Sequence, residues 1–118
     1  MVRGNDGAYE PKFTRFGYIP ITMRPSQSLE SKRDAVRAAA ARYRTTYPRV
    51  FGSVVRGADV DGSDLDLLVD ALPGTTLFDL GGLQVELEAL LGVPVDVVTL
   101  TDLPLKFRAQ VLAEARPV

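Results

Sequence analysis

The sequence predicts a single α/β (α+β) domain in which a small mixed β-sheet is flanked by helices. Its 118 residues fit one domain and leave no room for a second core of ordinary size. Helical and strand patterns follow each other in the order helix, strand, strand, helix, strand, helix, without an internal repeat. The composition, 46% hydrophobic and 25% charged, is ordinary for a globular protein.

The first 22 residues differ from the rest of the chain. They hold three glycines and two prolines and show no sustained hydrophobic period. We therefore predict that residues 1–22 form a loosely ordered extension and residues 23–118 form the domain, with Met23 as an alternative start. Four of the nine aromatic residues nevertheless lie in the extension: Tyr9, Phe13, Phe16 and Tyr18. This enrichment leaves open a partner-contacting arm or an additional edge strand.

Residues 24–48, RPSQSLESKRDAVRAAAARYRTTYP, predict the first helix of the domain. Ser26 or Ser28 is suited to cap its start, and Pro48 lies just past its end. Apolar residues recur at helical spacing on one side, namely Leu29, Val36, Ala40 and Tyr43. The basic residues mostly face elsewhere, and we interpret them as a solvated helix face.

Three β-rich runs supply the sheet. RVFGS (49–53) predicts a short strand that enters a tight turn, DLDLLVD (64–70) a second strand and VPVDVVTL (93–100) a third. LPLKFRAQVLAEA (103–115) predicts a closing helix with Pro104 in its first turn.

A further helix is predicted between the second and third strands, within TTLFDLGGLQVELEALLG, residues 75–92. Thr75 or Thr76 is suited to cap its start, and Gly92 is suited to end it. Two adjacent glycines at positions 81 and 82 weaken the assignment, because each costs about 1 kcal/mol relative to alanine inside a helix.

The chain contains neither cysteine nor histidine, which excludes disulfides, thiolate or imidazole metal sites and Ser-His catalysis. Its chemistry must use carboxylates, hydroxyls, amides, arginine and lysine, a set that suits the hard cation Mg²⁺. The formal net charge of −1 gives no general attraction to nucleic acid or to anionic membranes. No stretch predicts a membrane span or a signal peptide, so we expect a cytoplasmic protein.

The second predicted strand carries two aspartates at alternate positions. Asp64, Asp66 and Leu68 share one face, because side chains alternate along a strand. Two like charges so close repel each other unless a cation neutralises them. Asp96 interrupts the third β-rich run, where a buried unpaired charge is costly. If that strand lies beside the second, three carboxylates converge, enough for two metal ions.

A Gly-Ser pair precedes the aspartates. Gly52 permits a close approach of the backbone, and Ser53 offers a hydroxyl and an amide to a phosphate. Arg56 is suited to contact that phosphate or a nearby carboxylate. Asp59 and Asp61 lie in a glycine-rich turn and are interpreted as structural. Each signal alone is common in turns and strand ends, but their combination favours a functional site.

These residues carry a resemblance to a known superfamily. Gly52-Ser53, ten residues and then Asp64-x-Asp66 resemble the Gly-Ser-x10-Asp-x-Asp signature of the DNA polymerase β-like nucleotidyltransferases. The longer string VFGSVVRGADVDGSDLDLLVD, with a helix before it and VPVDVVTL after it, resembles the minimal nucleotidyltransferase (MNT) group. The resemblance covers about residues 23–118 and assigns no role to the extension.

The resemblance implies a DNA polymerase β-like core and Mg²⁺-dependent transfer of a nucleoside monophosphate from a nucleoside triphosphate, with release of pyrophosphate. By position, Gly52 and Ser53 would hold the β- and γ-phosphates, and Arg56 would support their turn. The implied metal ligands, for two ions, are Asp64, Asp66 and Asp96. Of these, Asp96 would complete the second metal site and help to activate the acceptor hydroxyl.

Minimal nucleotidyltransferases are typically small single domains that pair with a helical HEPN ribonuclease toxin. They neutralise it by transferring AMP from ATP to a tyrosine hydroxyl near the ribonuclease site. The resemblance thus implies an antitoxin in a hetero-oligomer with a HEPN-type toxin, without direct nucleic-acid binding. One alternative is an antitoxin that neutralises by docking alone. Another is transfer to a small molecule or an RNA end. The lack of an acceptor domain and of surplus basic charge argues against this alternative.

Overall fold

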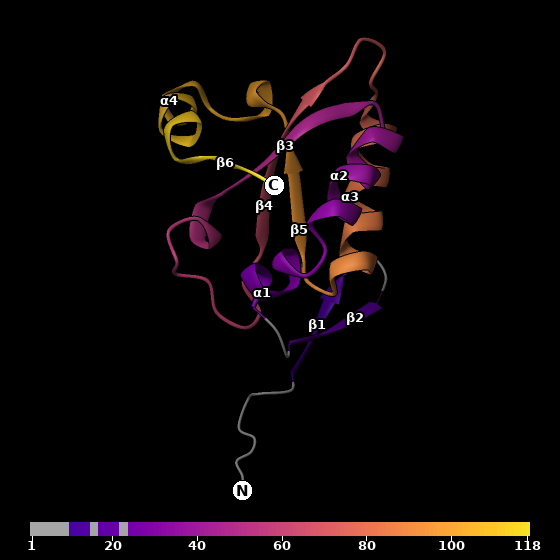
Figure 1. The fold of residues 1–118 in the computed structure, drawn as a ribbon, viewed down its shortest axis with the longest axis vertical. Coiled ribbons are helices and arrows are strands. Elements are labelled where there is room, and N and C mark those ends of the chain that lie inside the picture. The colour runs from indigo at the N-terminus through magenta and orange to yellow at the C-terminus, as the bar shows by residue number, and fades with distance from the viewer. Residues whose placement is uncertain (1–9, 15–16, 22–23) are drawn as a thin grey trace, which may run out of the picture.

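A four-stranded mixed sheet forms the centre of the computed structural model, which describes residues 10–14, 17–21 and 24–118 (Figure 1). The strands lie in the order β5-β4-β3-β6. Their bounds are β3 Thr45–Phe51, β4 Leu65–Ala71, β5 Val95–Val98 and β6 Arg116–Pro117. Helices flank this sheet, which confirms the predicted fold class.

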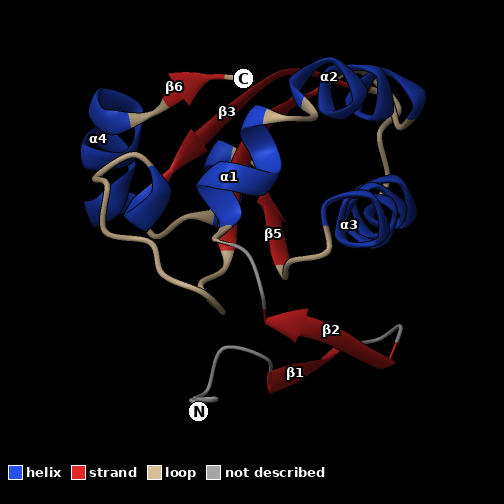
Figure 2. Ribbon diagram, turned by 60° about the horizontal axis from the view of Figure 1, so that its bottom comes forward, coloured by secondary structure: helices blue, strands red, loops and turns tan. Residues whose placement is uncertain are grey.

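The central strand β4 runs antiparallel to β3 and parallel to β5. Strand β6 pairs antiparallel with the other edge of β3 (Figure 2). In this register Asp66 of β4 lies between Phe51 of β3 and Asp96 of β5. A parallel connection needs a crossover, and α3 (Leu77–Leu91) supplies it between β4 and β5.

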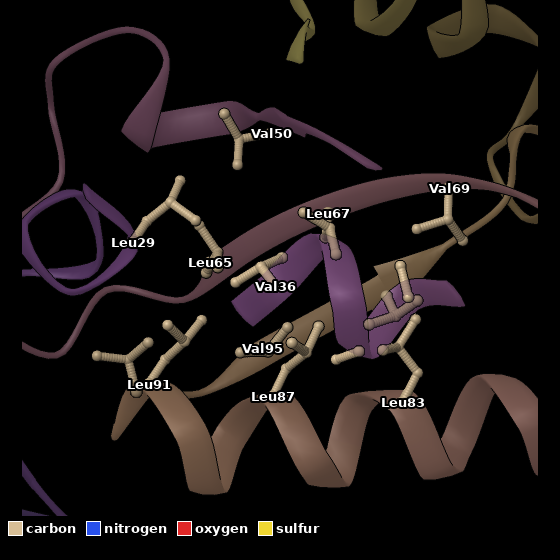
Figure 3. Close-up of a cluster of buried hydrophobic side chains, with 14 residues drawn as sticks. Leu29, Val36, Val50, Leu65, Leu67, Val69, Leu83, Leu87, Leu91 and Val95 are labelled. Atoms are coloured by element: carbon tan, nitrogen blue, oxygen red, sulfur yellow. The ribbon is translucent and has the colours of Figure 1, made fainter. Parts of the chain in front are cut away.

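The hydrophobic core lies between the sheet and the helices α2 (Arg33–Arg42) and α3. Leu65, Leu67 and Val69 of β4 point into it and are fully buried (Figure 3). The helices contribute Leu29, Val36, Ala39, Ala40, Leu83, Leu87 and Leu91. The alternation predicted for residues 64–70 is therefore confirmed, and it leaves Asp64 and Asp66 on the face away from this core.

Two side chains of α3 bind the outer edge of β5. The side-chain oxygens of Gln84 and Glu88 each accept a backbone N–H from β5, at 3.1 Å from Val97 and Val95 respectively. Glu88 is 5% exposed. An edge strand otherwise presents unpaired amides, so these bonds both close the sheet edge and fix the strand that carries Asp96.

The single helix predicted over residues 24–48 is wrong in its extent. The structure has two helices, α1 (Pro25–Glu30) and α2, separated at Ser31 and Lys32. Residues 45–48 belong to β3 instead of the helix end. The chain leaves α2 through Arg44, whose φ of 58° lies in the left-handed region and cannot continue the helix.

The start of α1 also differs from the prediction. Its N-cap is Arg24, and neither Ser26 nor Ser28 takes that position. The side chain of Asp59, from the loop after β3, accepts the Ser26 N–H at 2.9 Å and so supplies a remote cap. The hydroxyl of Ser28 is buried and donates to the carbonyl of Leu91 instead.

The boundaries of the later elements follow the sequence closely. Thr76 caps α3 in a capping box with Asp79, and Gly92 ends the helix with a φ of 70°. The closing helix α4 (Leu105–Glu114) begins just after Pro104, which is its N-cap and not part of its first turn. This helix lies on the other side of the molecule from α2 and α3 (Figure 1).

The extension contains a hairpin of two antiparallel strands, β1 (Glu10–Thr14) and β2 (Gly17–Ile21). These strands pair with each other in a separate two-stranded sheet, so the alternative of an edge strand on the main sheet is not what the structure shows. The aromatic side chains noted in the extension lie outside the residues whose side chains the structure describes. Its boundary at residue 22 stays a prediction.

Gly81 and Gly82 of α3 form a matched pair for a test of packing. A Cβ on Gly82 would lie 2.7 Å from the ring of Tyr43, whereas one on Gly81 would meet nothing within 4 Å. The Tyr43 hydroxyl donates to Glu86 at 2.9 Å, which holds the ring in place. We expect Gly81→Ala to raise the free energy of unfolding by about 1 kcal/mol. For Gly82→Ala, overpacking of about 1–3 kcal/mol offsets that gain.

Urea unfolding of both variants and the parent chain measures this difference. Equal stabilisation by the two substitutions would show that the Tyr43 ring moves aside with no loss of folding free energy.

Candidate active site

The structure brings the predicted site residues to one region of the sheet. Asp66 and Asp96 are directly paired across the parallel strands β4 and β5. Asp64 directly precedes β4 and lies two residues before Asp66, so its side chain leaves on the same face. Asp66 is half-buried, while Asp64 and Asp96 are exposed.

The Gly-Ser turn lies against Asp66. Gly52 begins the 3₁₀ turn η1 (Gly52–Val54) directly after β3, with a φ of +77° that favours glycine. A Cβ at this position would overlap the carboxylate oxygen Oδ2 of Asp66. Glycine is therefore required at this position for two reasons, its positive φ and the lack of space for a Cβ beside Asp66. Ser53 follows directly and so lies one residue from this contact.

The pKa of Asp66 is raised from 3.8 to about 6. Burial is the largest cause, followed by the negative charges of Asp96 and Asp64; Arg56 lowers the pKa and Glu114 raises it. Asp96 and Asp64 are thus close enough to Asp66 to oppose its ionisation. A cation that bound among them would relieve this repulsion, and a carboxylate perturbed in this way is typical of a functional site.

The carboxylates are not gathered into a closed cage. Across residues 24–118, the structure shows no three Asp or Glu side chains already arranged to hold a metal ion. Mg²⁺ fits such an open arrangement, because proteins usually bind it with one or two carboxylates and leave the other positions to water and substrate phosphates. The donor set, hard oxygens alone, suits the same ion.

Glu114 is a site residue that the sequence analysis missed. It ends α4, and its Oε2 accepts the Gly52 N–H at 3.0 Å while its Oε1 accepts from Arg56 at 3.1 Å. No motif or spacing marks this glutamate, since it lies about 60 residues after the turn. Its position depends on β6, a two-residue strand that the sequence pattern does not reveal.

The other acidic residues of the motif region have different surroundings. Asp59 is buried and caps α1, which extends its predicted structural role. Asp61 is exposed in the loop before β4. Asp70 ends the acidic face of β4 and pairs with the guanidinium of Arg49 at 2.6 Å.

A Gly-Ser turn, an adjacent arginine and carboxylates on neighbouring strands are the combination of groups that a metal-bound polyphosphate requires. Together with the mixed sheet, they define the class of enzymes that transfer nucleotidyl groups. The comparisons with known proteins agree with this class. The sequence profile of the nucleotidyltransferase domain family matches residues 37–118. The chain therefore belongs to the nucleotidyltransferase family. A solved structure of the minimal kind, 46% identical and covered over 95% of its length, places the chain among the minimal nucleotidyltransferases.

The solved structure of a candidate minimal nucleotidyltransferase is 46% identical, with a TM-score of 0.72 over 79% of this chain and 95% of the other. A candidate protein adenylyltransferase of Methanocaldococcus jannaschii is 39% identical over 66 residues, 56% of this chain and 71% of the relative. Protein adenylyltransferase MntA of Thermococcus cleftensis is 43% identical over 65 residues, 55% of this chain and 66% of the relative.

A more distant structure, a toxin–antitoxin with AMP-PNP, is 23% identical and has a TM-score of 0.61 over 75% of this chain and 70% of the other. At this level of identity, the likeness shows the shared fold. No helix in the described part of the chain has the length and apolar character that crossing a membrane requires.

The raised pKa of Asp66 has a consequence for stability. Because the folded state binds the proton more tightly than the unfolded state, ionisation of Asp66 destabilises the fold above pH about 6. This penalty disappears as the pH falls toward about 4. Without divalent cations, we expect Asp66→Asn to have a higher melting temperature than the parent chain at pH 7.5 and a similar one near pH 4.

Thermal unfolding in EDTA between pH 4 and pH 8 measures the melting temperatures of the parent chain and of Asp66→Asn. Asp61→Asn, which removes one negative charge from an exposed loop, is the matched control. A parent chain more stable than Asp66→Asn at every pH would contradict the assigned repulsion.

Proposed function

We propose that this chain transfers AMP from ATP to a tyrosine hydroxyl of a HEPN-type ribonuclease toxin, in a Mg²⁺-dependent reaction that releases pyrophosphate. The observation that carries the proposal is the direct pairing of Asp66 with Asp96, next to the Gly52 turn. The relatives that are protein adenylyltransferases support a protein acceptor, and the fold shared with an AMP-PNP-bound toxin–antitoxin supports ATP and a toxin partner.

The proposed site has two parts, a turn that binds phosphate and a group of aspartates that would bind metal. The Gly52-Ser53 turn holds the β- and γ-phosphates through the amide and hydroxyl of Ser53, because the Gly52 N–H donates to Glu114, and Arg56 adds positive charge beside it. Asp64 and Asp66 would hold Mg²⁺, and Asp96 would complete the second of two metal positions. Mg²⁺ bound there would neutralise charge on the phosphates and lower the pKa of the acceptor hydroxyl.

The chemical step needs a positioned nucleophile and a proton acceptor. The tyrosine oxygen forms a bond to the α-phosphorus of ATP, and the bond from that phosphorus to the pyrophosphate oxygen breaks. The hydroxyl proton passes to a carboxylate of the site, for which the exposed side chain of Asp96 is the candidate. The acceptor tyrosine must approach the sheet face that carries all three aspartates.

Docking without chemistry is the competing function. The small size of the chain and the four aromatic residues of its first 22 residues are what motivate it, because such an arm could cover the active site of a partner. Against it stands the raised pKa of Asp66, since a docking surface gains nothing from like charges held together at a cost in stability. The two functions differ in whether neutralisation requires the aspartates.

The decisive experiment incubates the purified chain with α-labelled ATP, Mg²⁺ and the HEPN-type protein encoded beside it. We expect label on a tyrosine of that protein, with a loss of at least about 100-fold in rate for the Asp64→Asn, Asp66→Asn double variant, as for removal of essential metal-binding groups. Chelation of Mg²⁺ with EDTA should abolish labelling.

Asp61→Asn serves as the matched control, because it removes one negative charge from the loop before β4, outside the proposed site. Labelling that survives the double substitution would contradict the assigned active site. Protection of cells by the double variant, with unchanged toxin binding, would favour docking.

A further inference from the structure

We propose that Glu114 is a positioning residue that holds the nucleotide-binding turn in its working geometry, an inference that rests on the proposed function. One carboxylate bridges two parts of that turn, the Gly52 amide at 3.0 Å and the Arg56 guanidinium at 3.1 Å. Its side chain is only 19% exposed, whereas that of Arg56 is 55% exposed. Glu114 is thus the fixed member of the pair, and Arg56 is the member that it restrains.

The sheet itself sets the position of Glu114. In the antiparallel pairing of β3 with β6, Val50 lies opposite Arg116. Gly52 follows Val50 by two residues, and Glu114, the last residue of α4, precedes Arg116 by two. The strand pair therefore brings the end of α4 close to the turn, where the Glu114 carboxylate accepts the Gly52 N–H. A residue placed in this way belongs to the framework of the turn.

The turn needs such a restraint. Gly52 has no side chain, so its peptide unit has more conformational freedom than any other residue would allow. Asp66 closes one side of this glycine, because its carboxylate occupies the space of a Cβ. Glu114 takes the N–H of the same residue. The two contacts together fix the orientation of the backbone from which Ser53 leaves.

The same bridge directs Arg56. The ion pair with Glu114, at 3.1 Å, holds its guanidinium beside the Gly52 turn. The ion pair with Arg56, whose guanidinium is exposed, contributes little to overall stability. The main effect of losing Glu114 should therefore fall on nucleotide binding, with a smaller effect on unfolding.

The opposite interpretation is that Glu114 occupies groups that a phosphate would otherwise use. In that case its removal would tighten nucleotide binding. The two interpretations predict changes of opposite sign in the dissociation constant for ATP, so one measurement separates them.

Calorimetric titration with ATP and Mg²⁺ tests the proposal on the chain alone. We expect Glu114→Ala to weaken binding about tenfold, in keeping with the loss of a charge-assisted hydrogen bond. Glu114→Gln should weaken binding less, because an amide oxygen still accepts the Gly52 N–H although the charge facing Arg56 is lost. Gln110→Ala, at an exposed position of the same helix, is the control.

Two further readouts distinguish positioning from a merely structural role. With the toxin as acceptor, Glu114→Ala should raise the KM for ATP more than it lowers kcat. In a cycle with Arg56→Ala, the effect of Glu114→Ala should shrink, since part of it acts through that arginine. The proposal would be overturned if the activity lost in Glu114→Ala were explained wholly by a smaller folded fraction, with ATP affinity intact. Equal or tighter binding of ATP by Glu114→Ala would overturn it as well.

The outcomes also separate this inference from the proposed function. If the parent chain binds ATP but labels no toxin, the proposed function fails, and the binding data still decide the role of Glu114. If the parent chain does not bind ATP with Mg²⁺, both fail.

Discussion

The parallel pairing of β4 with β5 is the constraint on which the site depends. It places Asp66 directly opposite Asp96, and nothing in the strands themselves compensates the repulsion between these carboxylates. The fold holds the pair by other means. Leucines and valines on the opposite face of β4 anchor it in the core, and Gln84 and Glu88 of α3 bind the outer edge of β5. Hydrophobic burial therefore stabilises an arrangement that its charges oppose.

Local patterns were enough to predict much of this arrangement. Alternation along residues 64–70 identified the face that carries the aspartates, because a one-residue shift would expose the leucines. Thr76 and Gly92 marked the ends of α3, because capping and left-handed termination depend on nearby residues. The spacing of the Gly-Ser and Asp-x-Asp motifs was enough to indicate the nucleotidyltransferase family, and the family profile confirms this membership.

Contacts between distant residues could not be predicted in the same way. The remote cap from Asp59 and the bridge by Glu114 both join segments more than 30 residues apart. In β3, Tyr47 has a φ of 52°, its ring lies 4.3 Å from the guanidinium carbon of Arg49, and the pairing with β4 shifts register there. No period or composition in the sequence signals these features, since each is set by the packed tertiary structure.

The shortness of β6 links the proposed nucleotide site to the dynamics of residues 116–118. Two strand pairs with β3 hold this segment, together with the bond from the Val118 N–H to the Pro48 carbonyl at 2.9 Å and that from the Arg37 guanidinium to the Val118 carbonyl at 2.6 Å. We expect a ladder this short to open by local unfolding at a lower free energy than global unfolding. Each opening would release the backbone next to Glu114. Nucleotide occupancy should therefore slow hydrogen exchange of the Arg116 and Val118 amides, although no atom of that segment needs to touch the nucleotide.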